Sequence, residues 1–158
     1  MARNWNEFCK LDDDLRDDLY WGKLLNEHLP PTIDYRLWEC YGIKKDKPLV
    51  AWCYHSYQNI GSNRHQNYEA EMSICSFDRR WATKYNISLM LALFFKRNMY
   101  NRLTALIRID NRQAVKLVKM AGFTLEGIIR RPKCELDILQ FSMLREDWEK
   151  GRFYEFYR

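Results

Sequence analysis

The sequence predicts a single α/β domain of the mixed class, and three observations support this prediction. The chain has 158 residues, 47% of them hydrophobic, which is enough for one domain with its own core. Hydrophobic residues alternate with polar ones in several segments and recur at helical spacing in others. A strand–helix–strand unit in the middle of the chain implies parallel pairing, whereas hairpin patterns elsewhere imply antiparallel pairing. We therefore expect one mixed sheet with helices packed on it, formed by residues 1–158.

The amino-terminal half is predicted to contain a helix followed by three strands. Leucine and aromatic residues recur at helical spacing over residues 12–28, and a Pro-Pro pair ends the pattern. Two runs rich in aromatic and β-branched residues flank a polar turn at 44–47, which indicates a hairpin. A polar loop at 58–67 then leads into a strand-like segment at 68–77. Its alternation places Ala70, Met72 and Ile74 on one face and Glu69, Glu71, Ser73 and Cys75 on the other.

The carboxy-terminal half is predicted to continue the α/β pattern and to end in an aromatic tail. Residues 86–101 are apolar nearly all round, as expected of a helix that is buried against a sheet. The tail over 149–158 is rich in aromatic and charged residues, and it could pack back on the domain or dock onto a protein partner. Between the buried helix and the tail, alternation predicts strands at 102–110, 124–131 and 137–147. Capping residues predict an amphipathic helix at 110–123.

The numbers and spacing of the cysteines and histidines, together with the net charge, limit the cellular location and the ligands that we expect. Five cysteines, an odd number without a C-x-x-C pair, indicate reduced thiols and a cytoplasmic location. The three histidines have no metal-ligand spacing among themselves or with the cysteines, so no metal site is predicted. No segment resembles a signal peptide or reaches the length of a membrane span. The formal net charge of +5 suits an anionic ligand, a nucleic acid or an acidic partner, and does not separate these.

A series of spaced motifs in the carboxy-terminal half resembles a known family. A strand ends in an Asp-Asn pair, and a small residue, Ala114, follows Asn111 by three positions. A Gly-Phe pair then closes a helix and leads into TLEGIIRR, and DILQFSMLREDW comes later. In this order the motifs resemble the GNAT superfamily of N-acetyltransferases, in the branch that acetylates protein N-termini, ribosomal-protein alanine among them, and some small amines. The resemblance covers about residues 35–148.

The resemblance implies a GNAT-like fold, in which the central mixed sheet is splayed between two parallel strands and helices lie on both faces. In this family the gap holds the pantetheine arm of acetyl-CoA, which bonds to the strand edges like an extra strand. The walls would be residues 69–75 and 102–110. Asn111 would reach the arm of the cofactor, or it would serve only as a helix N-cap. The implied function is acetyl-CoA-dependent transfer of an acetyl group to a primary amine, on a protein N-terminus, a lysine or a small molecule.

The family's phosphate loop is altered in this sequence. Its pattern is Gln or Arg, two residues, Gly, one residue, and Gly or Ala, and its backbone N–H groups cradle the pyrophosphate. The matching segment here is RRWATK, with Ala82 and Lys84 at the glycine positions. In one reading Arg79, Arg80 and Lys84 supply side-chain charge and acetyl-CoA still binds, which we prefer. In the other reading the phosphate site is vestigial.

Candidate catalytic groups also follow from the resemblance. Glu71 is the candidate base, acting on the amine directly or through a water, and the alternative is a strand glutamate on a solvated face. A backbone N–H near Ser76 or Phe77 would stabilise the developing oxyanion. Many relatives carry a Tyr where this chain has Val118, so the general acid is unassigned. A covalent acetyl intermediate on Cys75 is not favoured, because no His lies near it in sequence.

Two other classes of function remain open. The first is a non-catalytic GNAT-like binding or structural module, supported by the altered phosphate loop and the aromatic tail. Small proteins of this kind occur in bacteriophages, so such a module could belong to a phage particle. The second is a nucleic-acid binder, suggested by basic residues interleaved with aromatics at 79–85 and 152–158. Because no nucleic-acid motif is present, this second alternative ranks last.

Overall fold

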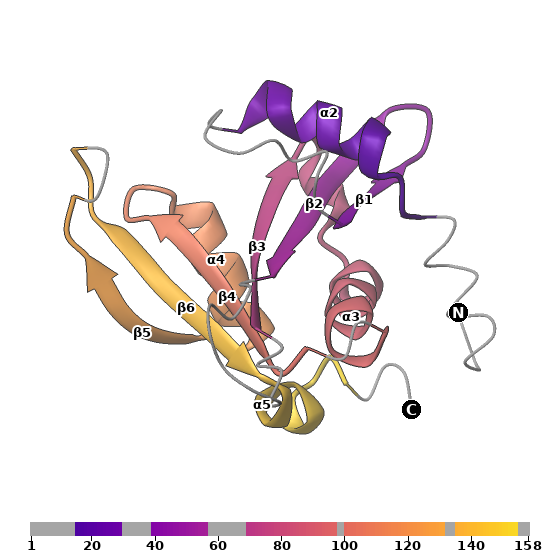
Figure 1. Cartoon of the computed structure of the whole chain (residues 1–158). Coiled ribbons are helices and arrows are strands. Elements are labelled where there is room, and N and C mark those ends of the chain that lie inside the picture. The colour runs from indigo at the N-terminus through magenta and orange to yellow at the C-terminus, as the bar shows by residue number, and fades with distance from the viewer. Residues whose placement is uncertain (1–14, 30–38, 57–68, 98–99, 132–134, 155–158) are drawn as a thin grey trace, which may run out of the picture.

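The computed structural model describes residues 15–29, 39–56, 69–97, 100–131 and 135–154. These residues form a six-stranded mixed sheet with helices on both faces, as the sequence predicted (Figure 1). The strand order is β1-β2-β3-β4-β6-β5, in which β3 and β4 are parallel and the other neighbours are antiparallel. The strands are β1 (Glu39–Lys44), β2 (Pro48–Ser56), β3 (Glu69–Ser76), β4 (Arg102–Arg108), β5 (Thr124–Ile129) and β6 (Ile138–Leu144). The helices are α2 (Asp18–His28), α3 (Lys84–Ala92), α4 (Arg112–Ala121) and α5 (Arg145–Lys150).

Local sequence signals account for where the helices begin and end. Helix α2 starts after Asp17, whose carboxylate accepts a hydrogen bond from the backbone N–H of Tyr20 (2.9 Å). The predicted start at residue 12 falls outside the described residues, as does the loop predicted at 58–67. Helix α4 is capped by Asn111 at its start, and Gly122, with a φ of 101°, ends it in the left-handed conformation that glycine adopts without strain.

Two predicted elements differ from the observed ones. The last strand was predicted to run to residue 147, but β6 ends at Leu144 and α5 follows at once. The carboxylate of Asp147 accepts a hydrogen bond from the Leu144 backbone N–H (3.1 Å), and this short-range bond starts the helix. The helix predicted over 86–101 is α3 followed by a wider π-helical segment, Leu93–Arg97.

The tail packs back on the domain as far as residue 154. Trp148 and Phe153 are both buried, and the Trp148 ring stacks on Phe95 with centroids 5.2 Å apart. The ring of Tyr154 meets the Trp148 ring edge-on at 4.7 Å. These aromatic contacts fix the described part of the tail against the end of the α3 segment.

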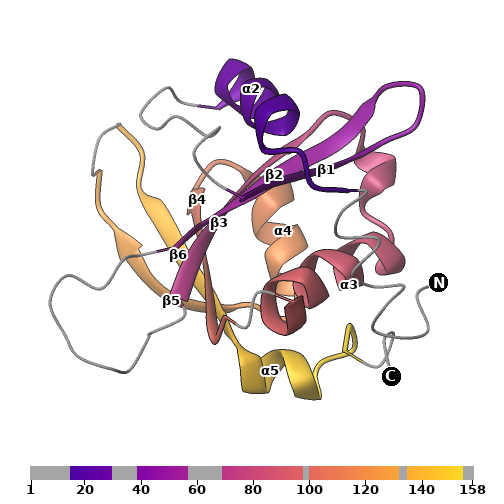
Figure 2. The ribbon, with the colours of Figure 1, turned by 45° about the vertical axis from the view of Figure 1, so that its right-hand side comes forward.

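The sheet separates two apolar layers. Figure 2 shows α2 over one face and α3 with α4 on the other. The larger core lies on the α3 and α4 side, and Ala70, Leu103 and Phe141 contribute to it from the sheet. On the opposite side Trp21 and Leu25 of α2 pack on a smaller cluster formed by Cys40, Ala51 and Cys53. Helix α2 comes so close to β1 that a Cβ at Gly42 would lie 2.3 Å from the Trp21 ring.

The two parallel strands diverge after three residue pairs, which confirms the splayed sheet. Glu69 pairs with Arg102, Ala70 with Leu103 and Glu71 with Thr104. Beyond these pairs β3 continues to Ser76 beside β2, and β4 continues to Arg108 beside β6. The facing edges of residues 72–76 and 105–108 therefore do not pair with each other. The resulting V opens away from the paired end (Figure 1).

Candidate active site

A cleft of about 340 Å³ occupies the V between β3 and β4. Its walls are mostly apolar and come from both strands, from α3 and from α4. The main lining residues are Met72, Ser73, Ile74, Ile87, Met90, Ala105, Leu106, Ile107, Asn111, Ala114, Leu117, Val118 and Ala121. A slot of this kind accepts an extended chain that hydrogen-bonds to the strand edges on either side.

Small side chains keep this cleft open. Ala114 and Ala121 stand two turns apart on α4, and Ala105 faces them from β4. Helix α4 turns these alanines and Val118 toward the cleft, while Arg112, Lys116 and Lys119 remain exposed on its other side. The amphipathic pattern of α4 thus both packs the helix on the sheet and shapes the wall of the cleft.

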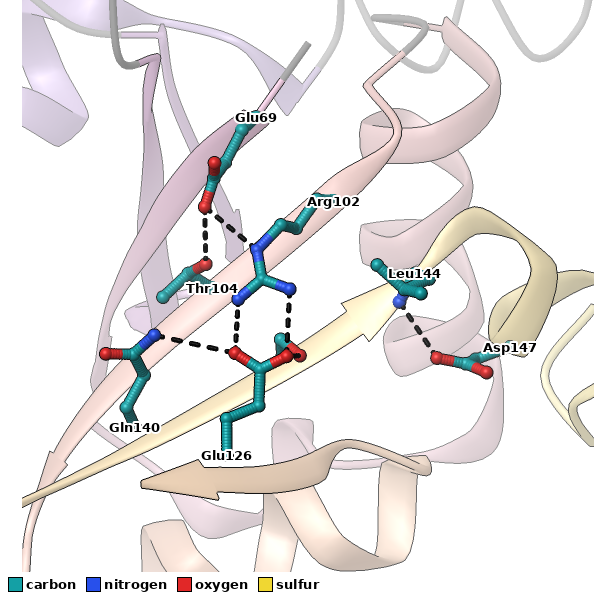
Figure 3. A network of polar contacts seen from close by, with 8 residues as sticks. Glu69, Arg102, Thr104, Glu126, Gln140, Leu144 and Asp147 are labelled. Carbon is teal, nitrogen blue, oxygen red and sulfur yellow. Dashed lines mark hydrogen bonds and ion pairs between the residues drawn. The ribbon is translucent and has the colours of Figure 1, made fainter. Parts of the chain in front are cut away.

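An ion-pair network closes the paired end of the V (Figure 3). The Arg102 guanidinium donates from Nε to Glu69 Oε1 (3.0 Å) and from Nη1 to Glu126 Oε1 (2.8 Å), and its Nη2 also binds Glu126. Thr104 Oγ1 donates to Glu69 (3.2 Å), and Ser142 Oγ donates to Glu126 (2.6 Å). The Arg102 guanidinium and the Ser142 hydroxyl lower the pKa of Glu126 to about 2. The network ties β3, β4, β5 and β6 together where the parallel strands begin to separate.

The predicted base, Glu71, lies at the paired end of the V, which we call the vertex. It is the last residue of β3 that pairs with β4, and its cross-strand neighbour on β2 is His55. Its side chain shares a sheet face with Glu69, which leaves several carboxylates on the α2 side of the vertex. Such a face suits a cationic amine as the approaching group.

The predicted phosphate loop forms a short 3₁₀ turn, Arg79–Trp81. Asp78 caps it by accepting hydrogen bonds from the Arg80 backbone N–H (2.9 Å) and from the Arg80 guanidinium. The backbone N–H of Trp81 donates to the Asp78 carbonyl, that of Ala82 to the Arg79 carbonyl, and that of Thr83 to the Trp81 carbonyl. The N–H groups of residues 80–83 are therefore engaged inside the protein.

The polar groups of the other residues predicted to contact a cofactor all form hydrogen bonds within the protein, but only Asn111 among them lines the cleft. The backbone N–H of Phe77 donates to the Leu49 carbonyl (3.0 Å), so this predicted oxyanion donor is engaged within the fold. The hydroxyl of Ser76 accepts from Trp81 Nε1 (2.9 Å) and anchors the turn to β3. Asn111 lines the cleft, and its Oδ1 caps α4 by accepting from the Ala114 N–H (3.2 Å).

Acetyl-CoA, which the family resemblance implies, fits the cleft between β3 and β4 better than it fits the turn at residues 78–84. The open edges of β3 and β4 and the apolar cleft suit the pantetheine arm. At the turn, by contrast, internal hydrogen bonds occupy the backbone N–H groups of residues 80–83, which form part of the segment that would cradle a pyrophosphate. Arg79 and Lys84 remain exposed there, and Arg80 is paired with Asp78. The pyrophosphate would therefore be held by side chains.

Sequence reasoning missed two polar residues next to the cleft, His55 and Ser73. Ser73 Oγ and His55 Nε2 lie 3.0 Å apart, and Ser73 lines the cleft. The alternation of β3 had placed Ser73 on the face of Glu71, but only the β2–β3 register brings His55 beside it. Among the described residues, no group of three or more His, Cys, Asp and Glu side chains is placed to hold a metal ion.

Comparison with solved structures finds a similar fold in acetyltransferases. A chimera of the spermidine N-acetyltransferase SpeG from Vibrio cholerae aligns with a TM-score of 0.60 and 14% identity, over 82% of this chain and 77% of that chain. An aminoglycoside N(6′)-acetyltransferase from Legionella pneumophila aligns at 0.58 and 17%, over 85% and 74% of the two chains. A ribosomal-protein-S5-alanine acetyltransferase from Vibrio fischeri aligns at 0.56 and 18%, over 80% and 68%.

These similarities show that the chain has the GNAT fold. No protein-family model matches the sequence, and no curated protein matches it. The similar structures include one described as an acetyltransferase of the GNAT family, from Bacillus anthracis, at a TM-score of 0.56 and 14% identity over 87% of this chain and 90% of that one. None of the helices in the described ranges is long and apolar enough to cross a membrane.

Proposed function

We propose that this protein is an acetyl-CoA-dependent N-acetyltransferase that acts on a primary amine. The observation that carries the proposal is the apolar cleft between β3 and β4, where two parallel strands leave their facing edges unpaired after Glu71 and Thr104. The fold shared with solved acetyltransferases supports it. The carboxylates on the α2 side of the vertex favour a cationic amine as the acceptor.

Each part of the chain would have a distinct task in this reaction. Bound acetyl-CoA would supply the acetyl thioester. The edges of β3 and β4 would hold the pantetheine arm by backbone hydrogen bonds, and the side chains of Arg79 and Lys84 would contact the phosphates. Glu71 at the vertex would promote loss of the proton from the amine through an intervening group, since it does not itself line the cleft. The apolar walls would exclude water from the thioester.

Calorimetric titration with acetyl-CoA and with CoA tests the cofactor part of the proposal. We expect saturable binding by the wild-type protein. The triple variant Arg79→Ala, Arg80→Ala, Lys84→Ala should bind at least about tenfold more weakly, because each lost charge–phosphate contact is worth about 1 kcal/mol or more. Release of free thiol with a panel of amines (spermidine, an aminoglycoside and a peptide with N-terminal alanine) then identifies the acceptor.

A matched variant separates a specific phosphate site from a general charge effect. The changes Lys45→Ala, Lys47→Ala and Lys150→Ala remove the same charge from exposed positions elsewhere. This control should keep the wild-type affinity. Absence of any binding by the wild-type protein would refute the enzyme proposal and leave a GNAT fold that works by binding another molecule.

A further inference from the structure

Ser73 lines the cleft, whereas the predicted base, Glu71, is not among the described residues that line it. Ser73 lies two residues beyond the last β3–β4 pair and is part of the cleft lining. Glu71 is paired at the closed end and is not among the described residues that line the cleft. Since a thioester at the narrow end of the V would lie next to the first separated residues, Ser73 is better placed than Glu71 to touch an attacking amine.

The Ser73 hydroxyl forms a hydrogen bond with a buried histidine, His55. His55 is 6% exposed, and its Nε2 lies 3.0 Å from Ser73 Oγ and 3.5 Å from Cys53 Sγ. Across the β2–β3 pair its direct neighbour is Glu71. Burial lowers the pKa of His55, and the Glu71 carboxylate opposes that shift. The imidazole is therefore neutral near pH 7 and has a carboxylate close enough to stabilise its charged form.

The neighbours of His55 on β1 and α2 that the structure describes are thiols and apolar side chains. The Cys53 thiol faces Cys40 across the β1–β2 pair, and burial together with this thiol contact raises the pKa of Cys53. Both cysteines are free thiols. Helix α2 presents Trp21 and Leu25 to this layer. Glu71, the direct cross-strand neighbour, therefore faces His55 with a carboxylate.

We propose that Ser73 and His55 form a proton relay that leads away from the cleft. Ser73 is the catalytic residue that contacts the amine. His55 acts through Ser73 as a positioning residue, and the Glu71 carboxylate stabilises its charged form. This inference rests on the proposed acetyl transfer and assigns the route of the proton. In the tautomer with its proton on Nδ1, His55 Nε2 accepts the hydrogen bond from Ser73 Oγ. The serine oxygen then keeps lone pairs that can accept a proton from a group bound in the cleft.

The proton and bond changes balance without another reactant. The substrate ammonium gives one proton to Ser73 Oγ as the serine proton passes to His55 Nε2, and the imidazolium later releases it to water. The amine nitrogen forms the C–N bond to the acetyl group, and the C–S bond of the thioester breaks. The second ammonium proton neutralises the departing thiolate. Amide, thiol and one released proton are the products.

Three substitutions in the full-length protein test the relay. Ser73→Ala removes the hydroxyl, Ser73→Thr keeps it, and His55→Gln keeps a polar partner that does not titrate. We expect Ser73→Ala to lower kcat about 100-fold or more with an unchanged Kd for acetyl-CoA, and Ser73→Thr to restore most of the rate. His55→Gln should lose the acidic limb of the kcat–pH profile below pH 6.5, whereas His28→Gln, at a surface histidine, should keep it.

An NMR titration of the His55 imidazole provides a reading that does not depend on turnover. Loss of the Ser73 hydroxyl removes a hydrogen bond to the neutral imidazole, so Ser73→Ala should raise the pKa of His55. Circular dichroism and the melting temperature establish that each variant is folded. An unchanged His55 titration in Ser73→Ala would overturn the relay even if no amine in the panel reacts.

The outcomes also separate this inference from the proposed function. A wild-type protein that transfers acetyl groups, with Ser73→Ala and His55→Gln retaining its rate and pH profile, would overturn the relay and leave the acetyltransferase proposal intact. A wild-type protein that does not bind acetyl-CoA would overturn both.

Discussion

The two halves of the candidate cofactor site differ in how they are built. The cleft is made of strand edges, and its opening follows from the point at which β3 and β4 stop pairing. The turn at residues 78–84 is made of local hydrogen bonds, and these use the backbone N–H groups of residues 80–83, which would otherwise be available to a phosphate. The cleft therefore matches the family expectation and the turn departs from it.

This difference shows which features tolerate sequence change. A splayed strand pair presents the same backbone groups whatever side chains it carries, and the overall fold is shared with solved structures at 14–18% identity. A backbone phosphate cradle depends on the local conformation of a few residues, and here the Asp78 cap and the Trp81 side chain fix that conformation. This difference predicts that changes in the cleft strongly weaken the binding of acetyl-CoA and that single changes in the turn have little effect on it.

The largest effect is expected when the cleft is filled. Ala114→Leu adds three carbon atoms to the α4 wall and should weaken acetyl-CoA binding by about 10- to 100-fold. The reason is that forcing groups into occupied space costs about 1–3 kcal/mol, and each 1.4 kcal/mol is a factor of ten. Calorimetry measures the change. Gln113→Leu, at the exposed neighbouring position on α4, is the control and should bind like the wild type. Equal affinities of both variants would place the cofactor arm elsewhere.

An intermediate effect is expected at the vertex. Arg102→Met leaves Glu69 and Glu126 on one face without their shared cation, and we expect the free energy of unfolding to fall by about 1–2 kcal/mol in urea denaturation. Arg108→Met breaks a more exposed ion pair with Asp110 and should change stability by less than about 0.5 kcal/mol. Equal losses in the two variants would mean that the network does not stabilise the closed end of the V.

The same network predicts a pH dependence. The pKa of Glu126 is lowered from 4.5 to about 2 in the folded protein, so the unfolded chain binds the proton more readily. The stabilisation from Glu126 is fully present above pH 4.5 and is lost as the pH falls toward 2. Urea denaturation between pH 6 and pH 3 should show this loss in the wild type. Arg102→Met should show a shallower decline, and a decline of unchanged slope would contradict the assignment.

The smallest effect is expected in the turn. Ala82 has a φ of −75°, which alanine adopts without strain, so glycine is not needed there for the conformation. Ala82→Gly should change the affinity for acetyl-CoA by less than about twofold, because the internal hydrogen bonds of the turn remain. Calorimetry with CoA and acetyl-CoA checks this. A tenfold gain in affinity would show instead that the missing glycine limits a backbone phosphate cradle.

The sequence alone determined the features that depend on short-range chemistry. Alternation in β3 assigned Glu71 and Ser73 to one face, and Asn111 and Gly122 marked the ends of α4, because these signals act within a few residues. The family resemblance supplied the splayed sheet, since the order of elements and motifs carries that information. The short helix α5 was missed, because a strand pattern running into Arg145 gives no local sign of the turn that Asp147 makes.

Only the tertiary structure decided which distant side chains meet. Arg102 contacts partners 33 and 24 residues away, and His55 reaches Ser73 across 18 residues, so neither pairing has a local signature. The engagement of the N–H groups in the turn was likewise hidden, because it depends on how Asp78 and the buried Trp81 fix the backbone. Sequence patterns specify which face a residue occupies. Strand register and packing set the distance between two such faces, and the chemistry of this site depends on that distance.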